Sequence, residues 1–239
     1  MDGTSGYRPL YRQVYDYLVR QIATGVWRPA EALPSEQELA AELGVSQGTV
    51  RKALDVVAAE KLVERRQGKG TYVAEQTQER ALFRFFRWAY PGGQRAIPTS
   101  MGETVKRRSS TSDEQIKLHL RENAKVIEIS RRRLIDGKPA IVETIVVPVT
   151  LFPDLDKRVP LPNTLYSLYQ SAYGINIVAV EEEVRAELVR KDDAKKLNLP
   201  VGSPLLRIER LAIALDGSRV ELRVSRCNNR DLVYAVTIR

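Results

Sequence analysis

The sequence predicts an α+β protein built from two parts, and three observations support this class. In the first third, helical patterns with their own capping residues precede a glycine-rich hairpin pattern. Farther along, apolar strands flank Asp-Gly turns, and one such unit recurs 79 to 80 residues later. We therefore expect a helical domain with a hairpin at residues 1–76, a connector at 77–95, and an antiparallel sheet with flanking helices at 96–239.

Composition narrows the class of protein before any motif is considered. The 239 residues include one His and one Cys, which excludes an intrachain disulfide and falls short of the four ligands of structural zinc. No run approaches the roughly 20 apolar residues of a membrane span, and the N-terminus lacks the apolar segment of a signal peptide. We expect a cytoplasmic protein without a membrane partner, metal or cofactor.

Apolar spacing and capping residues place three short helices in the first part. The first helix has an apolar stripe at every fourth position, made of Val14, Leu18 and Ile22. Ser35 and Glu38 match the S-x-x-E capping box, so a second helix should begin at residue 36 and end before Gly44. Ser46 is the next N-cap, and the helix after it buries an apolar face.

A hairpin with a basic tip follows these helices. In residues 62–74, apolar and polar residues alternate on both sides of Gln67-Gly68-Lys69-Gly70. This is the pattern of two strands joined by a tight turn. Two helices joined by a short turn and followed by a hairpin make up a winged helix-turn-helix. The order of the elements favours this plan more than any single element does.

The exposed face of the third helix suits the DNA major groove. Arg51 can reach guanine O6 and N7 with two hydrogen bonds, and Gln47 and Thr49 can add contacts to bases or phosphates. On the hairpin, Arg65 and Arg66 suit phosphates and Lys69 suits the minor groove; Ser46 offers phosphate contacts at the helix start. Taken alone, Arg51 and Lys52 fit an ordinary solvated helix face equally well.

The segment PSEQELAAELGVSQGTVRKALDVVAAEKLVERRQGKGTYV resembles the winged helix-turn-helix of the GntR superfamily of bacterial transcription regulators. The resemblance covers about residues 8–74 and implies that Thr49 and Arg51 contact an operator, while Gly68 and Lys69 place the wing. Gln37 and Gln47 depart from the family, in which many members carry a DNA-contacting arginine at each of these positions. The expected DNA-binding residues are Ser35, Gln37, Ser46, Gln47, Thr49, Arg51, Lys52, Arg65, Arg66, Gly68, Lys69 and Gly70.

Two stretches of the second part are alike. Asp113 corresponds to Asp192 and Arg131 to Arg210 at a spacing of 79, and the Asp-Gly turns at residues 136 and 216 correspond at a spacing of 80. Each unit reads as helix, strand, turn and strand. We expect both hairpins in one antiparallel sheet extended by residues 178–189 and 231–238, with Asn163 capping a helix between the units.

The motifs SRRRLIDGKPAIVETIVVP and SRVELRV resemble the UTRA effector-binding domain, which has a chorismate-lyase-like fold and marks the HutC subfamily. The resemblance covers roughly residues 80–239 and implies a small polar metabolite bound between the hairpins. The implied effector-binding residues are Ser100, Arg131, Arg133, Glu143, Glu221 and Tyr234. Arg131 and Arg133 lie on one face of a strand and suit a carboxylate or phosphate, although pairing with acids across the sheet is the alternative.

These features predict a ligand-responsive transcriptional repressor that binds a double-stranded operator as a homodimer and responds to a small-molecule effector. The alternatives are an enzyme of chorismate-lyase-like fold acting on a small anionic substrate, and a DNA-organising protein without a ligand. No nucleotide-binding fingerprint occurs, and His119 lacks a partner for nucleophilic catalysis, so we expect no enzyme activity.

The distribution of charge leaves one question open. Residues 1–76 hold 10 basic and 10 acidic residues, whereas residues 77–133 hold 13 basic against 6 acidic. Net charge therefore gives no argument for DNA binding by the first part. The excess suits either extra phosphate contacts beside an operator or a basic pocket for an anion.

Overall fold

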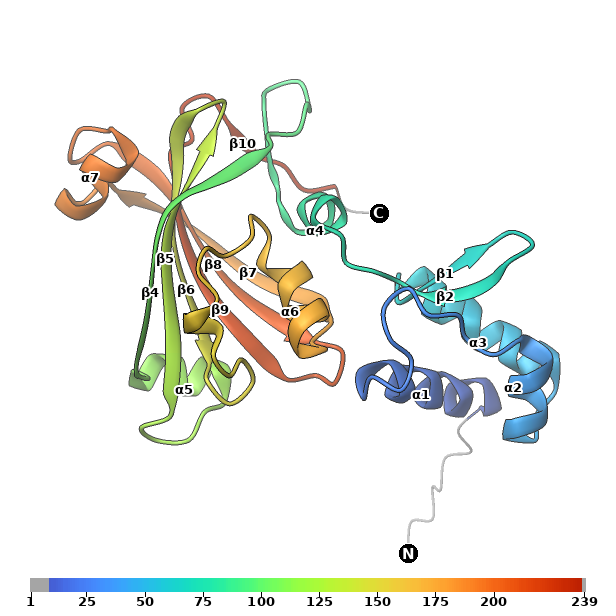
Figure 1. Ribbon diagram of the computed structural model, residues 1–239. Helices are drawn as coiled ribbons and strands as arrows, with labels where there is room; N and C mark the ends of the chain where they lie inside the picture. The colour runs from blue at the N-terminus through green and yellow to red at the C-terminus, as the bar shows by residue number, and fades with distance from the viewer. Residues whose placement is uncertain (1–8, 238–239) are drawn as a thin grey trace, which may run out of the picture. The chain divides into compact units, whose positions relative to one another are not determined.

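The computed structural model describes residues 9–237, and it confirms the predicted α+β class with an antiparallel sheet (Figure 1). Two compact units make up the chain. One holds Met1–Gln76 and Gln170–Asn176, and the other holds Thr77–Tyr169 and Ile177–Arg239. No helix among the described residues is long and apolar enough to cross a bilayer.

The first unit is a small helical domain with a hairpin. Its elements are α1 (Leu10–Ala23), α2 (Glu36–Leu43), α3 (Gln47–Ala59), β1 (Val63–Arg66) and β2 (Gly70–Val73). The predicted stripe of α1 is buried, and it shares the domain core with Leu39 of α2 and Leu54 of α3. Ala32 forms an isolated antiparallel bridge with Tyr72, so the chain before α2 is joined to the hairpin.

The predicted caps set the bounds of α2 and α3. The Ser35 hydroxyl accepts a hydrogen bond from the Glu38 amide, and the Glu38 carboxylate accepts one from the Ser35 amide, so the capping box is confirmed. Gly44 ends α2 at a φ of +63°, where a side chain would be strained. The Ser46 hydroxyl then caps α3 by accepting from the Thr49 amide.

The second unit is built on a six-stranded antiparallel sheet of order β4-β5-β6-β9-β8-β7. The strands are β4 (Pro98–Ser109), β5 (Lys125–Ile135), β6 (Lys138–Pro148), β7 (Ile177–Leu188), β8 (Pro204–Ala214) and β9 (Arg219–Cys227). The two repeated hairpins, β5–β6 and β8–β9, meet at the centre, where Thr144 pairs with Val224. The predicted repeat therefore forms one continuous sheet.

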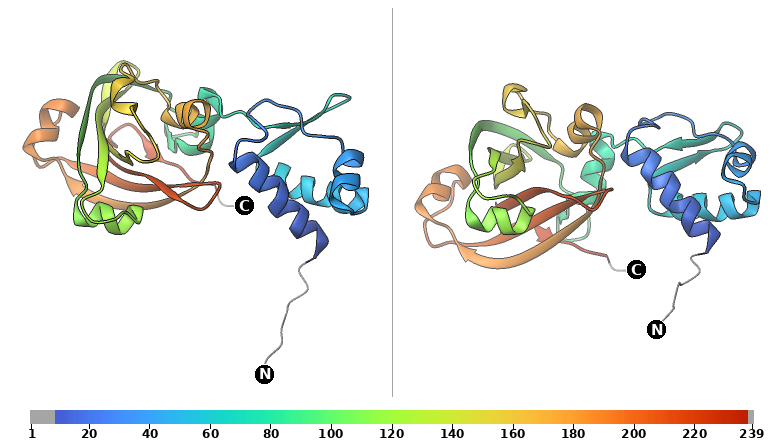
Figure 2. Two further views of the ribbon diagram at one scale, coloured as in Figure 1. Left: turned by 60° about the horizontal axis from the view of Figure 1, so that its bottom comes forward. Right: turned by 90° about the horizontal axis from the view of Figure 1, so that it is seen from below.

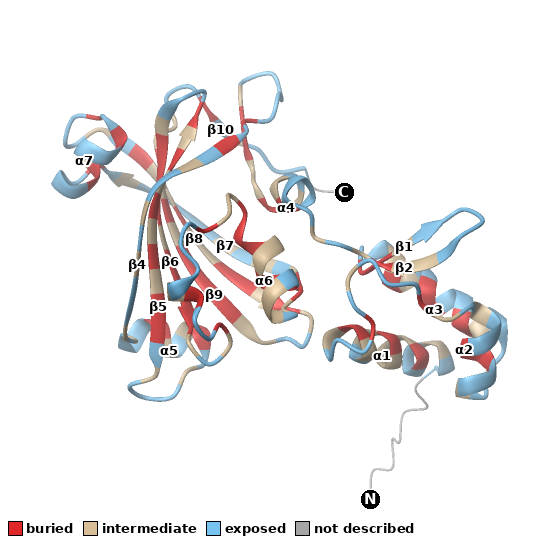
Figure 3. Ribbon diagram, in the orientation of Figure 1, coloured by how far each residue is buried: buried red, intermediate tan, exposed pale blue. Residues whose placement is uncertain are grey.

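Helices cover both faces of this sheet (Figure 2). Leu118 of α5 (Ser112–Leu118) and Leu197 of α7 (Lys191–Leu197) pack in the apolar clusters of one face. Side chains alternate along a strand, so the neighbouring residues face the opposite side. There lie the 3-10 turn η1 (Leu155–Lys157) and α6 (Leu165–Tyr173), over a buried floor that Figure 3 colours red.

The two repeated turns differ in length, which explains the change in spacing from 79 to 80. Ile135 pairs with Lys138, leaving a two-residue turn in which Asp136 and Gly137 both have positive φ. In the second hairpin, Ala214 bonds with Ser218 across three turn residues, and Gly217 has a φ of +83°. The extra residue therefore lies in the turn, and the sheet register is unaffected.

The expected connector contains regular structure, and the expectation for residues 231–238 is wrong. Within the expected connector, residues fold into α4 (Gln78–Phe85) and β3 (Trp88–Ala89). The stretch 231–238, of which residue 238 lies outside the described residues, does not extend the large sheet. Instead β10 (Val233–Tyr234) pairs with β3, and the strand that flanks the β5–β6 hairpin in the large sheet is β4.

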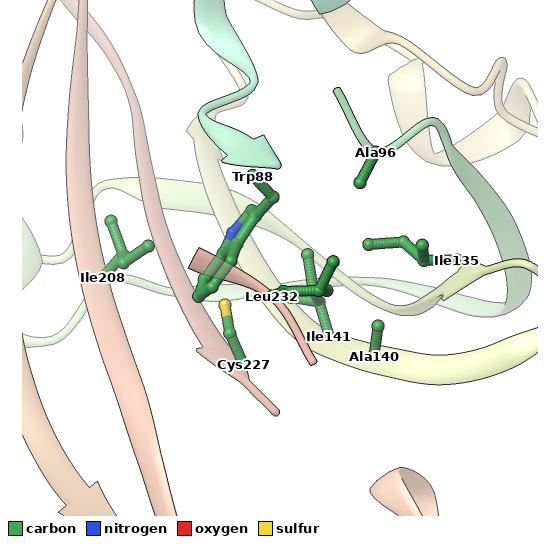
Figure 4. Packing of buried hydrophobic residues seen from close by; sticks show 8 residues of the cluster. All are labelled: Trp88, Ala96, Ile135, Ala140, Ile141, Ile208, Cys227 and Leu232. Carbon is green, nitrogen blue, oxygen red and sulfur yellow. The ribbon is translucent and has the colours of Figure 1, made fainter. Parts of the chain in front are cut away.

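The small β3–β10 sheet is anchored on an apolar cluster. Figure 4 shows Trp88 and Leu232 packed with Cys227 and with side chains of β5, β6 and β8. Burial raises the pKa of the Cys227 thiol, which is an apolar packing group here. Through this cluster, the segments that contain β3 and β10 pack against strands of the large sheet.

Candidate nucleic-acid interface and ligand pocket

In the first unit, the residues predicted to contact DNA lie on α2, α3 and the hairpin. Thr49 is half-buried, and the exposed members are Ser35, Gln37, Ser46, Gln47, Arg51, Lys52, Arg65, Arg66, Gly68, Lys69 and Gly70. Ser46 and Thr49 share a hydroxyl contact of 2.9 Å at the start of α3. The structure thus brings the predicted set together within one domain.

Aromatic and acidic partners hold the basic side chains of this domain. Lys52 Nζ lies 4.3 Å from the centre of the Tyr11 ring, and the Arg66 guanidinium lies 4.2 Å from that of Tyr72. Arg51 Nη2 lies 2.8 Å from the Glu36 carboxylate. These contacts orient cations on an exposed surface.

The tip of the hairpin depends on glycine. Gly68 and Gly70 have φ values of +69° and +109°, which other residues adopt only with strain. The Tyr72 hydroxyl donates to the Lys69 carbonyl at 3.1 Å and fixes the turn between them. Lys69 is thereby presented at the end of the wing.

In the second unit, a cluster of buried charges lies on the face of the sheet that carries α6. Arg131 Nε donates to Glu143 at 2.8 Å, and Arg133 Nη1 lies 3.6 Å from the same carboxylate. Arg223 Nη1 approaches Glu143 from β9 at 3.4 Å. Arg131 is 2% exposed and Glu143 is 3% exposed, so this is no solvated strand face.

Opposing effects act on the carboxyl of Glu143. Burial raises its pKa, but Arg131, Arg223 and Arg133 together lower the pKa by more, and it lies well below the ordinary value of 4.5. Burial also lowers the pKa of Arg133, to about 10. Glu143 and Arg133 therefore both carry their charges at neutral pH.

Glu221 is the second buried carboxylate of the cluster, and its oxygens are occupied. It accepts hydrogen bonds from the hydroxyls of Tyr166 and Tyr169 and from two nitrogens of Arg223. The side chain is fully buried and lies outside the lining of the cavities described next. Its contacts orient Arg223.

Two small cavities lie over the charged cluster. The first, of about 40 Å³, is lined by Arg131, Arg133, Asn163, Tyr166 and side chains of α4; the second, of about 30 Å³, by Arg87, Trp88, Glu143, Ser225 and Tyr234. Phe86, Arg210 and Arg223 line both. Within the described residues, Arg131 Nη2 and Arg133 Nε are buried and have no hydrogen-bond acceptor.

Helix α4 forms part of the wall of the first cavity. Phe85 packs edge-on against Tyr166 at 5.0 Å, and its carbonyl accepts from Arg210 Nη2 at 2.5 Å. The Arg84 guanidinium donates to the Val178 carbonyl. The segment expected as a connector is therefore bonded to residues that line the pocket.

Of the other predicted pocket residues, Tyr234 lines the second cavity, whereas Ser100 is not among the residues that line either cavity. The Ser100 hydroxyl donates to Asn163 Oδ1 at 3.2 Å, and Arg133 Nη2 donates to the same oxygen at 3.1 Å. Tyr234 donates to Glu182 and lines the second cavity. Asn163 does not cap α6 as expected, because its side chain bonds Pro98, Ser100 and Arg133 and the helix begins at Leu165.

The excess of basic residues in 77–133 has acidic partners within its own unit. Arg107 makes two hydrogen bonds with Asp156, and Arg108 bonds Glu114 and Glu128. The remaining excess includes the buried Arg131 and Arg133.

Arg210, Arg223 and Glu36 are among the residues that the sequence analysis did not assign to either site. Arg210 carried a signal, because it corresponds to Arg131 in the repeat. Arg223 carried another, since it lies two positions after Glu221 and so on the same strand face. Glu36 had none, because an acidic side chain argues against a DNA-facing position when it is considered alone.

Comparison with known proteins decides between the candidate classes. Residues 10–73 match the family model described as bacterial regulatory proteins, gntR family, and residues 97–231 match the UTRA domain. The chain belongs to the GntR family of bacterial regulators and carries a UTRA domain. A regulator is supported over the enzyme that was the alternative.

Relatives of this GntR-family regulator match it over nearly their whole length. The histidine utilization repressor of Pseudomonas putida is 31% identical over 86% of this chain and 82% of its own. The Escherichia coli repressor MngR, of a mannosyl-D-glycerate transport and metabolism system, is 29% identical over 97% and 96%. The ligand-binding domain of a GntR-family protein from Bordetella bronchiseptica, 23% identical, shares the fold with a TM-score of 0.60 over 65% of this chain and 98% of its own.

Proposed function

We propose that this chain is an operator-binding repressor that an anionic metabolite releases from DNA. One observation carries the choice of an anion: two buried guanidinium nitrogens, Arg131 Nη2 and Arg133 Nε, have no acceptor among the described residues, and both arginines line the first cavity. The nearby carboxylates of Glu143 and Glu221 already accept several donors. A ligand that supplies acceptors and negative charge satisfies these donors best.

Relatives named as repressors support the sign of regulation. The protein would act in the cytoplasm as a homodimer, because a two-fold pair of winged domains matches two operator half-sites. Light scattering at micromolar concentration tests this assembly, and a purely monomeric chain contradicts it.

Release from DNA requires coupling between the pocket and the DNA-binding unit. The cavities, of about 40 and 30 Å³, are far smaller than the roughly 300 Å³ and more of ordinary ligand pockets. A metabolite must therefore displace part of the wall. Helix α4 is the part we propose to move, because it follows the first unit directly in the chain and its Phe85 lines the cavity.

A thermal-shift titration tests the anion pocket. The full chain is heated with phosphorylated sugars, with carboxylates, and with the matching neutral sugars, and only anions should raise the melting temperature. A saturating ligand at 100 times its Kd adds about 2.7 kcal/mol of stability. Arg133→Gln should abolish the shift, whereas Arg132→Gln, one position along on the opposite strand face, should retain it. Equal shifts with neutral sugars would refute the proposal.

Operator binding is tested with Arg51→Ala. Wild-type protein should enrich a common sequence from a library of random DNA duplexes. Arg51→Ala should lose the preference for that sequence and keep the fold, since the side chain is exposed. Unchanged sequence preference would defeat the assignment of Arg51.

A further inference from the structure

Glu36 lies at the first position of α2 and contacts Arg51 of α3 and Arg65 of the hairpin strand β1. Its Oε2 accepts a hydrogen bond from Arg51 Nε at 2.9 Å and lies 2.8 Å from Arg51 Nη2 in an ion pair. Its Oε1 lies 3.6 Å from Arg65 Nη2, on β1. A carboxylate that repels phosphate thus sits among the side chains we expect to meet DNA.

The two contacts with Glu36 are made through Nε and Nη2, which form one edge of the Arg51 guanidinium. A guanidinium is planar and offers five N–H donors in a fixed fork. Glu36 occupies the edge formed by Nε and Nη2. Among the described residues no contact is made through Arg51 Nη1, and the edge formed by Nη1 and Nη2 matches guanine O6 and N7 in the major groove.

Arg65 does not compete for this carboxylate at hydrogen-bond distance. Its Nη2 lies 2.8 Å from Asp55 of α3, closer than the 3.6 Å to Glu36. The hydrogen bond with Glu36 raises the pKa of Arg51, so it stabilises the charged form of the guanidinium. Each arginine therefore has its own acidic partner, and Glu36 serves Arg51.

We propose that Glu36 is a positioning residue that makes Arg51 selective for guanine. This inference rests on the proposed operator binding. An unpaired arginine at this place could swing to the nearest phosphate and bind any sequence. Glu36 holds the fork in one orientation and repels phosphates, so non-specific affinity falls while discrimination rises.

The test uses the full chain and a duplex selected from a random library. The readout is the ratio of two Kd values, for the selected duplex and for the same duplex with the Arg51-dependent guanine replaced by adenine. The variants are Glu36→Gln, Arg51→Ala and their combination. Glu42→Gln is the matched control, since it makes the same charge change in α2 at a carboxylate bonded to Tyr17.

Discrimination by wild-type protein should be roughly 5- to 150-fold, as for other bidentate arginine–guanine pairs. Glu36→Gln should reduce the ratio at least about fivefold and tighten binding to the adenine duplex. Glu42→Gln should leave the ratio unchanged. In the Arg51→Ala background, Glu36→Gln should have no further effect on the ratio, because its action passes through Arg51.

Two results would overturn the proposal. One is a ratio of Kd values for Glu36→Gln that equals the wild-type ratio, provided that the variant unfolds at the wild-type melting temperature when Trp27 fluorescence is followed. The other is an equal loss of discrimination with and without Arg51, which would place the effect of Glu36 elsewhere. If wild-type protein enriches no sequence at all, the proposed operator binding itself fails, and this inference fails with it.

Discussion

Replacement of Glu143 by Gln isolates the charge balance of the pocket. The wild-type carboxylate lies 2.8 Å from Arg131, 3.4 Å from Arg223 and 3.6 Å from Arg133. Glutamine keeps the size and removes the charge, so three buried guanidinium groups lose their shared counter-ion. Loss of one partner from a buried ion pair costs about 3–5 kcal/mol.

This cost should appear as a lower melting temperature of the second unit. For domains of this size, each kcal/mol lowers the melting temperature by about 2–4 °C, so the expected decrease is roughly 6–20 °C. The chain has two tryptophans, Trp27 in the first unit and Trp88 in the second. Variants in which one is replaced by Phe allow the fluorescence melt of each unit to be followed separately.

Inorganic phosphate should restore part of the loss. With Glu143 neutral, the pocket has one more net positive charge, so an anion binds the variant more tightly than wild type. Glu122→Gln, an exposed acid of the same unit, should change stability by less than about 0.5 kcal/mol. A decrease no larger than that of this control would refute the idea that Glu143 neutralises the arginines.

The same variant should change the dependence of stability on pH. Because the folded-state pKa of Glu143 is depressed, its contribution is complete above the ordinary value of 4.5 and is lost as pH falls below it. Glutamine has no such titration. The difference in stability between wild type and variant should therefore narrow as the pH is lowered below about 4.5.

Two further substitutions test other parts of the structure. Ser46→Ala removes the N-cap of α3 and should lower the free energy of unfolding of the first unit by about 1 kcal/mol, measured by urea titration of Trp27 fluorescence. Arg107→Gln should leave the salt dependence of DNA binding unchanged, since Arg107 is bonded to Asp156; a slope shallower by about one would show that it contacts phosphate.

Capping residues and turn residues predicted the helix starts and hairpins, because these features depend on contacts between residues that are close in the sequence. Ser35, Ser46 and the Asp-Gly turns act within a few residues, so helix starts and hairpins could be placed. The spacing of two residues along a strand also placed Arg131 and Arg133 on one face. These expectations needed no knowledge of packing.

Contacts between distant segments could not be predicted in this way. Asn163 looked like a helix cap, but its amide is engaged by Pro98 and Arg133, which lie far away in the sequence. The role of α4 as a pocket wall depends on Phe85 meeting Tyr166. Such pairings are set by tertiary packing, and a single sequence carries no periodic signal for them.

The central pairing of Thr144 with Val224 places a local two-fold axis through the sheet, because these residues also correspond in the repeat at a spacing of 80. Glu143 and Arg223 are then equivalent positions, and they meet at 3.4 Å with opposite charges. A duplicated hairpin with identical residues would offer a bound molecule two equal orientations. Because Glu143 is acidic and the equivalent Arg223 is basic, the two halves of the cavity differ in charge. An asymmetric metabolite would therefore bind in one orientation.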